Sequence, residues 1–311
     1  MYSIIIPVYN RPEELDDLLG SLCKQTCDDF EVVVVEDGSS LSSENVVNKY
    51  LESLTIRYYK IPNSGPGKAR NYGAKRSKGD YLLILDSDTI MPPAWLACVD
   101  ESLKENPVDA FGGPDRADDS FTPIQKAINY AMTSFFTTGG IRGGTKKLDK
   151  FYPRSFNMGI KREVYEHLGG FSGMRYGEDI DFSLRILEAG YKTALFPSAW
   201  VYHKRRTSFT QFFRQVQHSG EARIALNQKH PGSMKAVHCL PALFTVGTCI
   251  LLIGTFFCWW AIVPLFLFAC LLFIDATMRN KGNLQVGGLA VVAGFIQMFG
   301  YGSGFLRAMF S

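Results

Sequence analysis

The chain has 311 residues, enough for one large domain or two smaller ones, and a formal net charge of only +3. Its mean hydropathy of −0.01 is high for a soluble enzyme and argues against a chain that is water-soluble throughout. The cause is the tail, because from Val237 onward the only charged residues are Asp275, Arg279, Lys281 and Arg307.

The cysteines and the first residues bear on the cellular compartment. The seven cysteines are odd in number, form no Cys-Xaa-Xaa-Cys pair and lie partly in the apolar tail, so we expect them to be reduced and structural. Residues 2–9 form a short strand-like run that charges follow at once, which is not the pattern of a signal peptide. We therefore expect the front part of the chain to stay in the cytoplasm.

The first 90 residues alternate short apolar runs with amphipathic segments. Such alternation predicts βαβ units and a parallel sheet with right-handed crossovers, as in nucleotide-binding α/β folds. There is no Gly-Xaa-Gly-Xaa-Xaa-Gly after the first run and no P-loop Gly-Lys-Ser/Thr, so phosphate binding would depend on a metal and on basic side chains. The expected strands are 3–8, 30–35, 55–61 and a run from 81, and the expected helices are 13–24, 43–54 and 67–78.

The run from Tyr81 ends in two carboxylates, Asp86 and Asp88. A short and wholly apolar run is typical of a strand covered on both faces, and ligands bind at the carboxyl ends of such strands. Two acids separated by one residue can hold Mg²⁺ or Mn²⁺ against a diphosphate. A solvated turn after a strand has the same composition, so the pair alone does not decide between these alternatives.

The second half of the front part continues the alternation. The acids after Gly177 would occupy the first turn of a helix, where the helix dipole favours them whether or not they have a further role. The glycine-rich stretch 139–147 is either a loop that closes over substrate or a plain surface loop. The expected elements are a helix to about 104, a strand at 108–112, an amphipathic helix in the first half of 120–150, a strand at 155–160, helices at 162–167 and after 177, and one last strand at 193–202.

Seven short motifs, taken in order, resemble the family-two glycosyltransferases, which are inverting enzymes of the GT-A fold that use nucleotide-diphosphate sugars. The motifs span about the first 205 residues, and their order is more specific than any one of them. The resemblance implies an α/β fold with a mainly parallel central sheet. The motifs are Ile-Ile-Ile-Pro-Val-Tyr-Asn, Val-Val-Glu-Asp-Gly-Ser-Ser, Ala-Arg-Asn, Leu-Asp-Ser-Asp, Phe-Asn-Met-Gly, Gly-Gly-Phe and Gly-Glu-Asp-Ile-Asp.

The resemblance also implies how the sugar donor is bound. Pro7 and Tyr9 would line the nucleobase pocket, and Asp37 would accept a hydrogen bond from the base. Arg70 would lie near the nucleotide, where a cation helps to stabilise the diphosphate leaving group. Glu178 is assigned to the donor side as well.

The remaining site residues are implied in the same way. Asp86 would bind the ribose or support the metal, and Asp88 would ligate Mn²⁺ or Mg²⁺ directly. Asp179 corresponds to the general base that deprotonates the acceptor hydroxyl as it attacks the anomeric carbon. His203 would complete the metal site, although a histidine beside the cations at 204–206 also fits a basic surface.

One element of the family's processive polysaccharide synthases is missing. Those enzymes carry Gln-Xaa-Xaa-Arg-Trp, whereas residues 214–218 read Arg-Gln-Val-Gln-His without tryptophan. We therefore expect transfer of one sugar to an acceptor hydroxyl, on a lipid-linked acceptor or a surface glycan. A processive synthase and a non-catalytic membrane-bound nucleotide-sugar binder remain alternatives.

A basic segment joins the front part to the tail. Residues 204–235 hold seven bases and one acid, with aromatic residues interleaved at helical spacing, so the segment could lie on an anionic membrane surface. Nucleic-acid binding is not expected, because an apolar tail follows directly. The expected domains are 1–205 (catalytic), 206–238 (basic, membrane-proximal) and 239–311 (membrane anchor).

The tail is long enough for several membrane spans. About 35 residues, 240–274, carry no charge, which suits two coupled spans, 240–258 and 259–276. A third span is expected at 284–306, where glycines at 300, 302 and 304 would allow close helix contacts. By the positive-inside rule, we expect a multi-pass protein of the inner (plasma) membrane, with its catalytic domain cytoplasmic and its C-terminus outside. A pair of buried core helices is the alternative.

Overall fold

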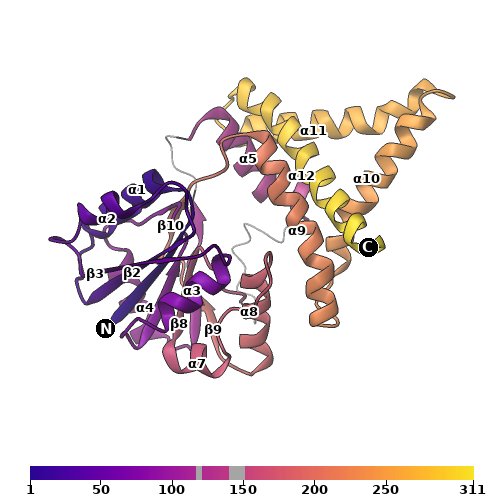
Figure 1. Ribbon diagram of the computed structural model, residues 1–311. Coiled ribbons are helices and arrows are strands. Elements are labelled where there is room, and N and C mark those ends of the chain that lie inside the picture. The colour runs from indigo at the N-terminus through magenta and orange to yellow at the C-terminus, as the bar shows by residue number, and fades with distance from the viewer. Residues whose placement is uncertain (117–120, 140–150) are drawn as a thin grey trace. The chain divides into compact units, whose positions relative to one another are not determined.

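The computed structural model describes residues 1–116, 121–139 and 151–311 (Figure 1). The chain forms two compact units, unit 1 (Met1–Arg116 with Lys147–His203) and unit 2 (Ala117–Lys146 with Lys204–Ser311). Residues 121–139 thus group with the C-terminal helices and not with residues 1–116. The expected domain limits stay a prediction, and most of the glycine-rich stretch 139–147 lies outside the described residues.

Among the described residues, unit 1 contains a seven-stranded sheet of order β3-β2-β1-β4-β8-β6-β9. Strands β1 to β4 run parallel, β8 runs antiparallel between β4 and β6, and β9 is parallel to β6. The expected mainly parallel sheet is confirmed. Its strands are β1 Tyr2–Val8, β2 Phe30–Asp37, β3 Ile56–Ile61, β4 Tyr81–Leu85, β6 Ala110–Gly112, β8 Asn157–Lys161 and β9 Thr193–Leu195.

Helices cover both faces of this sheet, because alternate strand residues point to opposite sides. Ile4 and Ile6 of β1 are fully buried in a cluster with α1, α2 and α4, while Ile5 is buried in a cluster with α3, α7 and α8. This two-sided burial explains why the strands read as unbroken apolar runs. The helices are α1 Pro12–Leu22, α2 Glu44–Asn48, α3 Pro66–Ala74, α4 Trp95–Glu105, α7 Arg162–His167 and α8 Glu178–Glu188.

The expected single strand at 193–202 is wrong, because the structure has two strands there. β9 ends at Leu195, and β10 (Val201–His203) belongs to a second, small sheet with β5 (Thr89–Ile90) and β7 (Asp115–Arg116). Pro197 has no backbone N–H for a sheet ladder, and the Ala199 N–H donates to the Phe196 carbonyl at 3.1 Å to close a turn. The turn brings His203 opposite Thr89, one residue from Asp88.

The regular elements in the described part of unit 2 are all helices, and α12 is the one that most of them contact. Helices α5, α9, α10 and α11 all pack against it. Three of the helices are long and apolar enough to cross a membrane, which confirms the expected number of candidate spans. The helices are α5 Pro123–Thr133, α6 Phe135–Thr138, α9 Phe209–Lys229, α10 Ala236–Gly254, the short 3-10 helix η1 Trp259–Ile262, α11 Val263–Arg279 and α12 Leu284–Phe310.

Glycines allow the backbones to approach α12 closely. A Cβ atom added to Gly304 would lie 2.0 Å from the Gln217 carbonyl oxygen of α9, and one added to Gly302 would lie 2.4 Å from the Pro241 carbonyl oxygen of α10. The expected close contacts at these glycines are therefore confirmed, and they reach two different helices.

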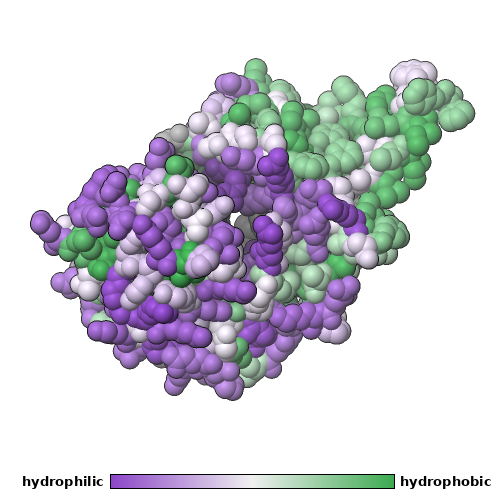
Figure 2. Space-filling view, in the orientation of Figure 1, coloured by the Kyte–Doolittle hydropathy of each residue, from purple (hydrophilic) through white to green (hydrophobic). Residues whose placement is uncertain are grey.

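Other helices of unit 2 cover the apolar face of α9. Phe212, Val216 and Leu226 are buried, and the first two belong to a cluster that includes residues of α5, α11 and α12. Helices of the same unit therefore cover the aromatic side chains of this basic segment, and its expected place on a membrane surface stays a prediction. In contrast, α10 and α11 leave large side chains exposed, and Figure 2 shows a nearly continuous hydrophobic surface over them.

Candidate functional site

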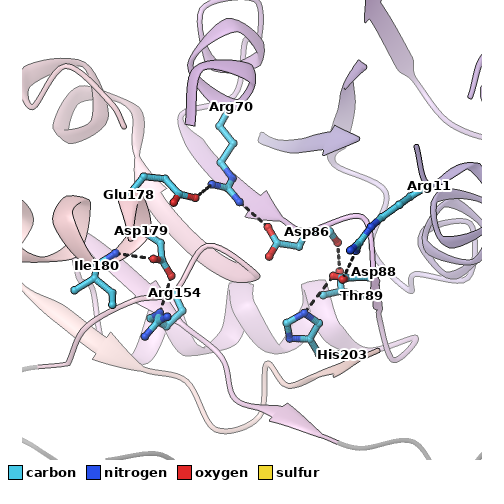
Figure 3. Close-up of polar contacts among 10 residues, drawn as sticks. All are labelled: Arg11, Arg70, Asp86, Asp88, Thr89, Arg154, Glu178, Asp179, Ile180 and His203. Atoms are coloured by element: carbon cyan, nitrogen blue, oxygen red, sulfur yellow. Dashed lines mark hydrogen bonds and ion pairs between the residues drawn. The ribbon is translucent and has the colours of Figure 1, made fainter. Parts of the chain in front are cut away.

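The two acids after β4 lie in a tight turn at the carboxyl end of the strand (Figure 3). The Thr89 hydroxyl and backbone N–H donate to the Asp86 carbonyl at 2.7 and 3.2 Å, which closes the turn. The Asp88 side chain is 9% exposed and that of Asp86 is 30% exposed. The turn thus presents both carboxylates at one end of the sheet, as the sequence predicts.

His203 joins these acids from the second sheet. Ligand atoms of Asp86, Asp88 and His203 lie within 4.8 Å of one another, and His203 Nε2 is 3.1 Å from Asp88 Oδ1. The Phe156 ring stacks on the imidazole at 5.0 Å. His203 Nδ1 is buried without a hydrogen-bond partner in the part of the chain that the structure describes. Two carboxylates and an imidazole suit Mn²⁺ or Mg²⁺, so these residues fit a divalent cation.

Arg70 links this group to the acids of α8. Its guanidinium donates to Asp86 and to Glu178, each at 2.7 Å, and its side chain is only 4% exposed. Burial tends to lower the pKa of Arg70, but the two carboxylates outweigh burial and raise it. Burial and the neighbouring Asp179 raise the pKa of Glu178 in spite of the opposing charge of Arg70. A fixed positive charge therefore stands between the two acidic groups.

Asp179 has a different cation as its partner. Arg154 Nε donates to Asp179 Oδ2 at 2.7 Å, and the Ile180 N–H donates to Oδ1 at 2.8 Å. Burial by itself would raise the pKa of Asp179, but the charge and hydrogen bond of Arg154 outweigh burial, with help from Arg70, and hold that pKa below its ordinary value. Asp179 is therefore ionised at neutral pH.

The residues expected at the nucleobase lie at the ends of β1 and β2. Tyr9 is 52% exposed, and Pro7 pairs with Val35 two residues before Asp37. The Asp37 carboxylate accepts from the Ser64 N–H at 2.7 Å and from the Gly65 N–H at 2.8 Å. In the structure, Asp37 thus orders the turn before α3, and its expected contact with a base stays a prediction.

That turn borders a pocket of about 300 Å³. Ser64, Gly65 and Lys68 line one side of it, and Ser172 and Arg175 line the other. The pocket therefore lies between the start of α3 and the loop that leads to Glu178, close to the expected donor residues.

Two arginines of the site were not predicted. Arg11 forms an ion pair with Asp88, and Arg154 forms the pair with Asp179 (Figure 3). Arg11 directly follows the Pro-Val-Tyr-Asn motif, so its position is a signal that sequence reasoning could have used. Arg154 lies in an irregular segment before β8, where no pattern marks it.

Comparisons with known proteins agree with this fold. A model of the family described as Glycosyl transferase family 2 matches residues 3–169. An uncharacterised glycosyltransferase of Haemophilus influenzae is 31% identical over 220 residues, which cover 67% of this chain and 70% of that protein.

Two solved structures are similar in fold. The mannosyltransferase PcManGT of Pyrobaculum calidifontis, in complex with GDP-Man and Mn²⁺, has a TM-score of 0.67 at 19% identity, covering 94% of this chain and 86% of that one. Staphylococcus aureus TarS residues 1–349 with UDP-GlcNAc has a TM-score of 0.53 at 18% identity, covering 98% and 90%. The family match, the relative and the GT-A-type sheet together establish that this chain belongs to glycosyltransferase family 2 and carries three apolar C-terminal helices consistent with a membrane anchor.

Proposed function

We propose that the protein transfers one sugar from a nucleotide-diphosphate sugar to an acceptor hydroxyl with inversion, in a reaction that depends on a divalent cation. The observation that carries this proposal is the convergence of Asp86, Asp88 and His203 within 4.8 Å at the carboxyl end of β4. The ion pairs of Arg70 with Asp86 and with Glu178 of α8 support a single site for the proposed donor-binding and base residues.

Binding of the nucleotide-sugar donor is proposed to depend on positive charges. Asp88 and His203 would hold Mn²⁺ or Mg²⁺, with Asp86 as a third ligand or a ribose contact. The metal, when bound, neutralises the diphosphate and stabilises it as a leaving group. Arg70 supplies a permanent charge beside it, with Pro7, Tyr9, Asp37 and Glu178 completing the donor site. In support, PcManGT was solved with GDP-Man and Mn²⁺, and TarS was solved with UDP-GlcNAc.

Asp179 is the proposed general base. The acceptor oxygen attacks the anomeric carbon from the face opposite the nucleotide, the bond from that carbon to the phosphate oxygen breaks, and the nucleoside diphosphate leaves. The acceptor proton passes to Asp179, which its lowered pKa keeps ionised and ready to accept it. A single displacement of this kind inverts the configuration.

The acceptor is proposed to be lipid-linked or a growing surface glycan at the plasma membrane, with residues 1–205 in the cytoplasm. The support is the apolar unit that follows the catalytic domain in the same chain, because an attached enzyme meets membrane-bound acceptors at high local concentration. The absence of Gln-Xaa-Xaa-Arg-Trp at residues 214–218 supports transfer of one sugar per encounter. If the enzyme is instead processive, the size of the product would reveal a long polymer.

The test is turnover of a panel of nucleotide sugars by membranes that contain the full chain, with and without Mn²⁺ and with lipid extracts as acceptor source. We expect one donor to be consumed only with metal, Asp88→Ala to lose donor binding, and Asp179→Asn to keep binding but lose turnover. Asp100→Asn is the matched control, since Asp100 pairs with Lys104 on the exposed side of α4. Donor binding without turnover under every acceptor would favour a non-catalytic binder.

A further inference from the structure

The helices of the membrane anchor are not arranged as three successive crossings. In three successive crossings, the first and third helices would run in the same direction. Here earlier residues of α10 meet later residues of α12, because Pro241 adjoins Gly302 and Thr245 Oγ1 is 3.5 Å from the Met298 carbonyl oxygen. The chain direction of α10 is thus opposite to that of α12.

Helix α11 also runs in the direction opposite to α12. The Phe268 ring meets the Phe295 ring edge to face with centroids 5.6 Å apart, Leu272 adjoins Gly294, and Thr277 adjoins Gly287. Successive residues of α11 therefore contact progressively earlier residues of α12. Helix α11, like α10, runs antiparallel to α12. The first part of α10 lies along the second half of α12, and the last part of α11 lies along the first half.

Between these contacts, the chain leaves α12 and returns. Figure 1 shows α10 and α11 as the two arms of a V that meet at η1, with α12 closing the open side. Helices of 19, 21 and 27 residues measure about 28, 31 and 40 Å at 1.5 Å per residue. In this triangle, α12 is the base and η1 the apex, and about ten residues of each arm extend beyond the contacts of Thr245 and Phe268 with α12. Ten residues measure about 15 Å, which reaches the middle of a hydrocarbon core about 30 Å thick.

The side of α12 that does not contact α10 and α11 is covered by α9 and α5. The charged residues of α9 must remain in contact with water. Helix α9 packs along its second half, where a Cβ atom on Gly300 would meet Val216, and α5 packs along the first half. Helix α9 is 21 residues long but is not a candidate span, and it carries Glu221, which lies 3.8 Å from Arg307 of α12. If α12 crossed a bilayer, α9 would be drawn into the hydrocarbon beside it, at a cost of several kcal/mol for its charges.

The charges and aromatic residues follow the same division. The charged residues after Val237 all lie at the base of the triangle, near the end of α11 or the end of α12. Asp275 is held there by Tyr130 of α5 at 2.8 Å. At the apex, Phe256 and Phe257 are each 88% exposed, and Trp259 and Trp260 are 63% and 61% exposed. Aromatic side chains so exposed at a charge-free tip match a surface that inserts into lipid.

We propose that unit 2 enters the membrane from one face only, as a V-shaped wedge of α10 and α11, with α12 lying along the surface beneath α5 and α9. The wedge takes the acyl chains of the near leaflet as its partner. The C-terminus then stays on the same side of the membrane as residues 1–205. This inference rests on the proposed membrane attachment, and it is independent of the proposed reaction.

The first test is the side of the membrane on which the C-terminus lies. Fusions of the full chain to green fluorescent protein and to alkaline phosphatase after Ser311 report cytoplasmic and external ends, respectively. We expect fluorescence and no phosphatase activity, as for a fluorescent fusion before Met1 that serves as the control. An active phosphatase fusion would establish an odd number of crossings and overturn the wedge.

The second test is the apex itself. In the wedge, the double change Trp259→Glu with Trp260→Glu puts two charges into hydrocarbon, so we expect at least a tenfold loss of the membrane-bound fraction after an alkaline wash. Three crossings would place the same residues in external water and leave binding unchanged, which would overturn the proposal. Lys281→Glu at the base is the control and should remain bound. A wild type that never sediments with membranes would instead defeat the attachment on which the inference rests.

Discussion

Arg154 and Asp179 form an ion pair of 2.7 Å between an irregular segment and the first turn of α8. One carboxylate oxygen of the proposed base therefore binds a cation that lowers the pKa of Asp179. A carboxylate whose pKa is lowered on folding stabilises the fold above its unfolded pKa. That contribution is lost as the pH falls through the lowered value.

We predict that Arg154→Met moves the acid limb of the kcat/KM profile to higher pH. Without the Arg154 guanidinium, the effect of burial on Asp179 is no longer offset by its main partner, and the pKa of Asp179 rises. More of the base is then protonated at low pH, so activity falls more at pH 6 than at pH 8. The measurement is kcat/KM against pH with the identified donor. Lys60→Met removes an exposed charge that pairs with Glu44 and should leave the limb in place. An acid limb that does not move in Arg154→Met would show that Asp179 is not the group that titrates.

Arg11 is expected to compete with the metal for Asp88. The two form an ion pair, and the other Asp88 oxygen faces His203. Asn10, which has a φ of 53°, accepts hydrogen bonds from the backbone N–H groups of Ser40 and Leu41. These bonds stabilise the backbone conformation that directs the Arg11 side chain toward Asp88. The Arg11 side chain is 28% exposed and can leave, whereas Arg70 is 4% exposed and is held by two carboxylates.

We therefore predict that Arg11→Gln binds Mn²⁺ at least about tenfold more tightly than the wild type, because a competing charge next to the ligand is gone. The measurement is a titration of donor-free protein followed by the electron paramagnetic resonance of free Mn²⁺. Lys49→Gln, which removes a charge paired with Asp16, should not change the affinity. Unchanged or weaker binding in Arg11→Gln would mean that Arg11 does not compete.

Arg70→Gln should destabilise unit 1 by about 3–5 kcal/mol, the usual cost of removing one partner from a buried ion pair. Two carboxylates lose their shared cation, and the pKa of Glu178, already raised by burial, rises further. The loss should be smaller at pH 5 than at pH 7, because protonation of Glu178 removes its unpaired charge. Thermal unfolding at both pH values measures this, with Lys104→Gln on an exposed pair as the neutral reference. An equal loss at both values would contradict the role given to Glu178.

Gly304→Ala should separate α9 from α12. Its methyl group would lie 2.0 Å from the Gln217 carbonyl oxygen, so the two backbones must move apart, at a cost of about 1–3 kcal/mol. Gly288→Ala is the matched control on the same helix, since nothing lies within 4 Å of its Cβ position and alanine favours helix. Thermal stability of the detergent-solubilised chain should fall in the first variant and hold or rise in the second. Equal behaviour of the two would refute the close packing.

The class of fold can be predicted from the sequence, and so can the places of the acidic residues at the end of β4 and the start of α8. Apolar runs such as 4–8 and 82–85 identify buried strands because two-sided burial leaves no polar position in them. Asp86, Asp88 and Asp179 could be predicted because they end a strand or begin a helix inside short ordered motifs. The apolar tail was recognisable from its lack of charge alone.

Which side chains meet cannot be predicted from the sequence, because the meeting residues lie far apart along the chain. Arg154 and Asp179 are 25 residues apart and Arg11 and Asp88 are 77 apart, with no periodicity to connect either pair. The split of 193–202 into β9 and β10 depends on a turn, and that turn brings His203 to the acids. For the tail, hydropathy measures how apolar a helix is but not which way it runs against its neighbours. Three apolar stretches therefore have the same hydropathy whether they cross a membrane as a bundle or enter it as a wedge. The contacts of α10 and α11 with α12 favour the wedge.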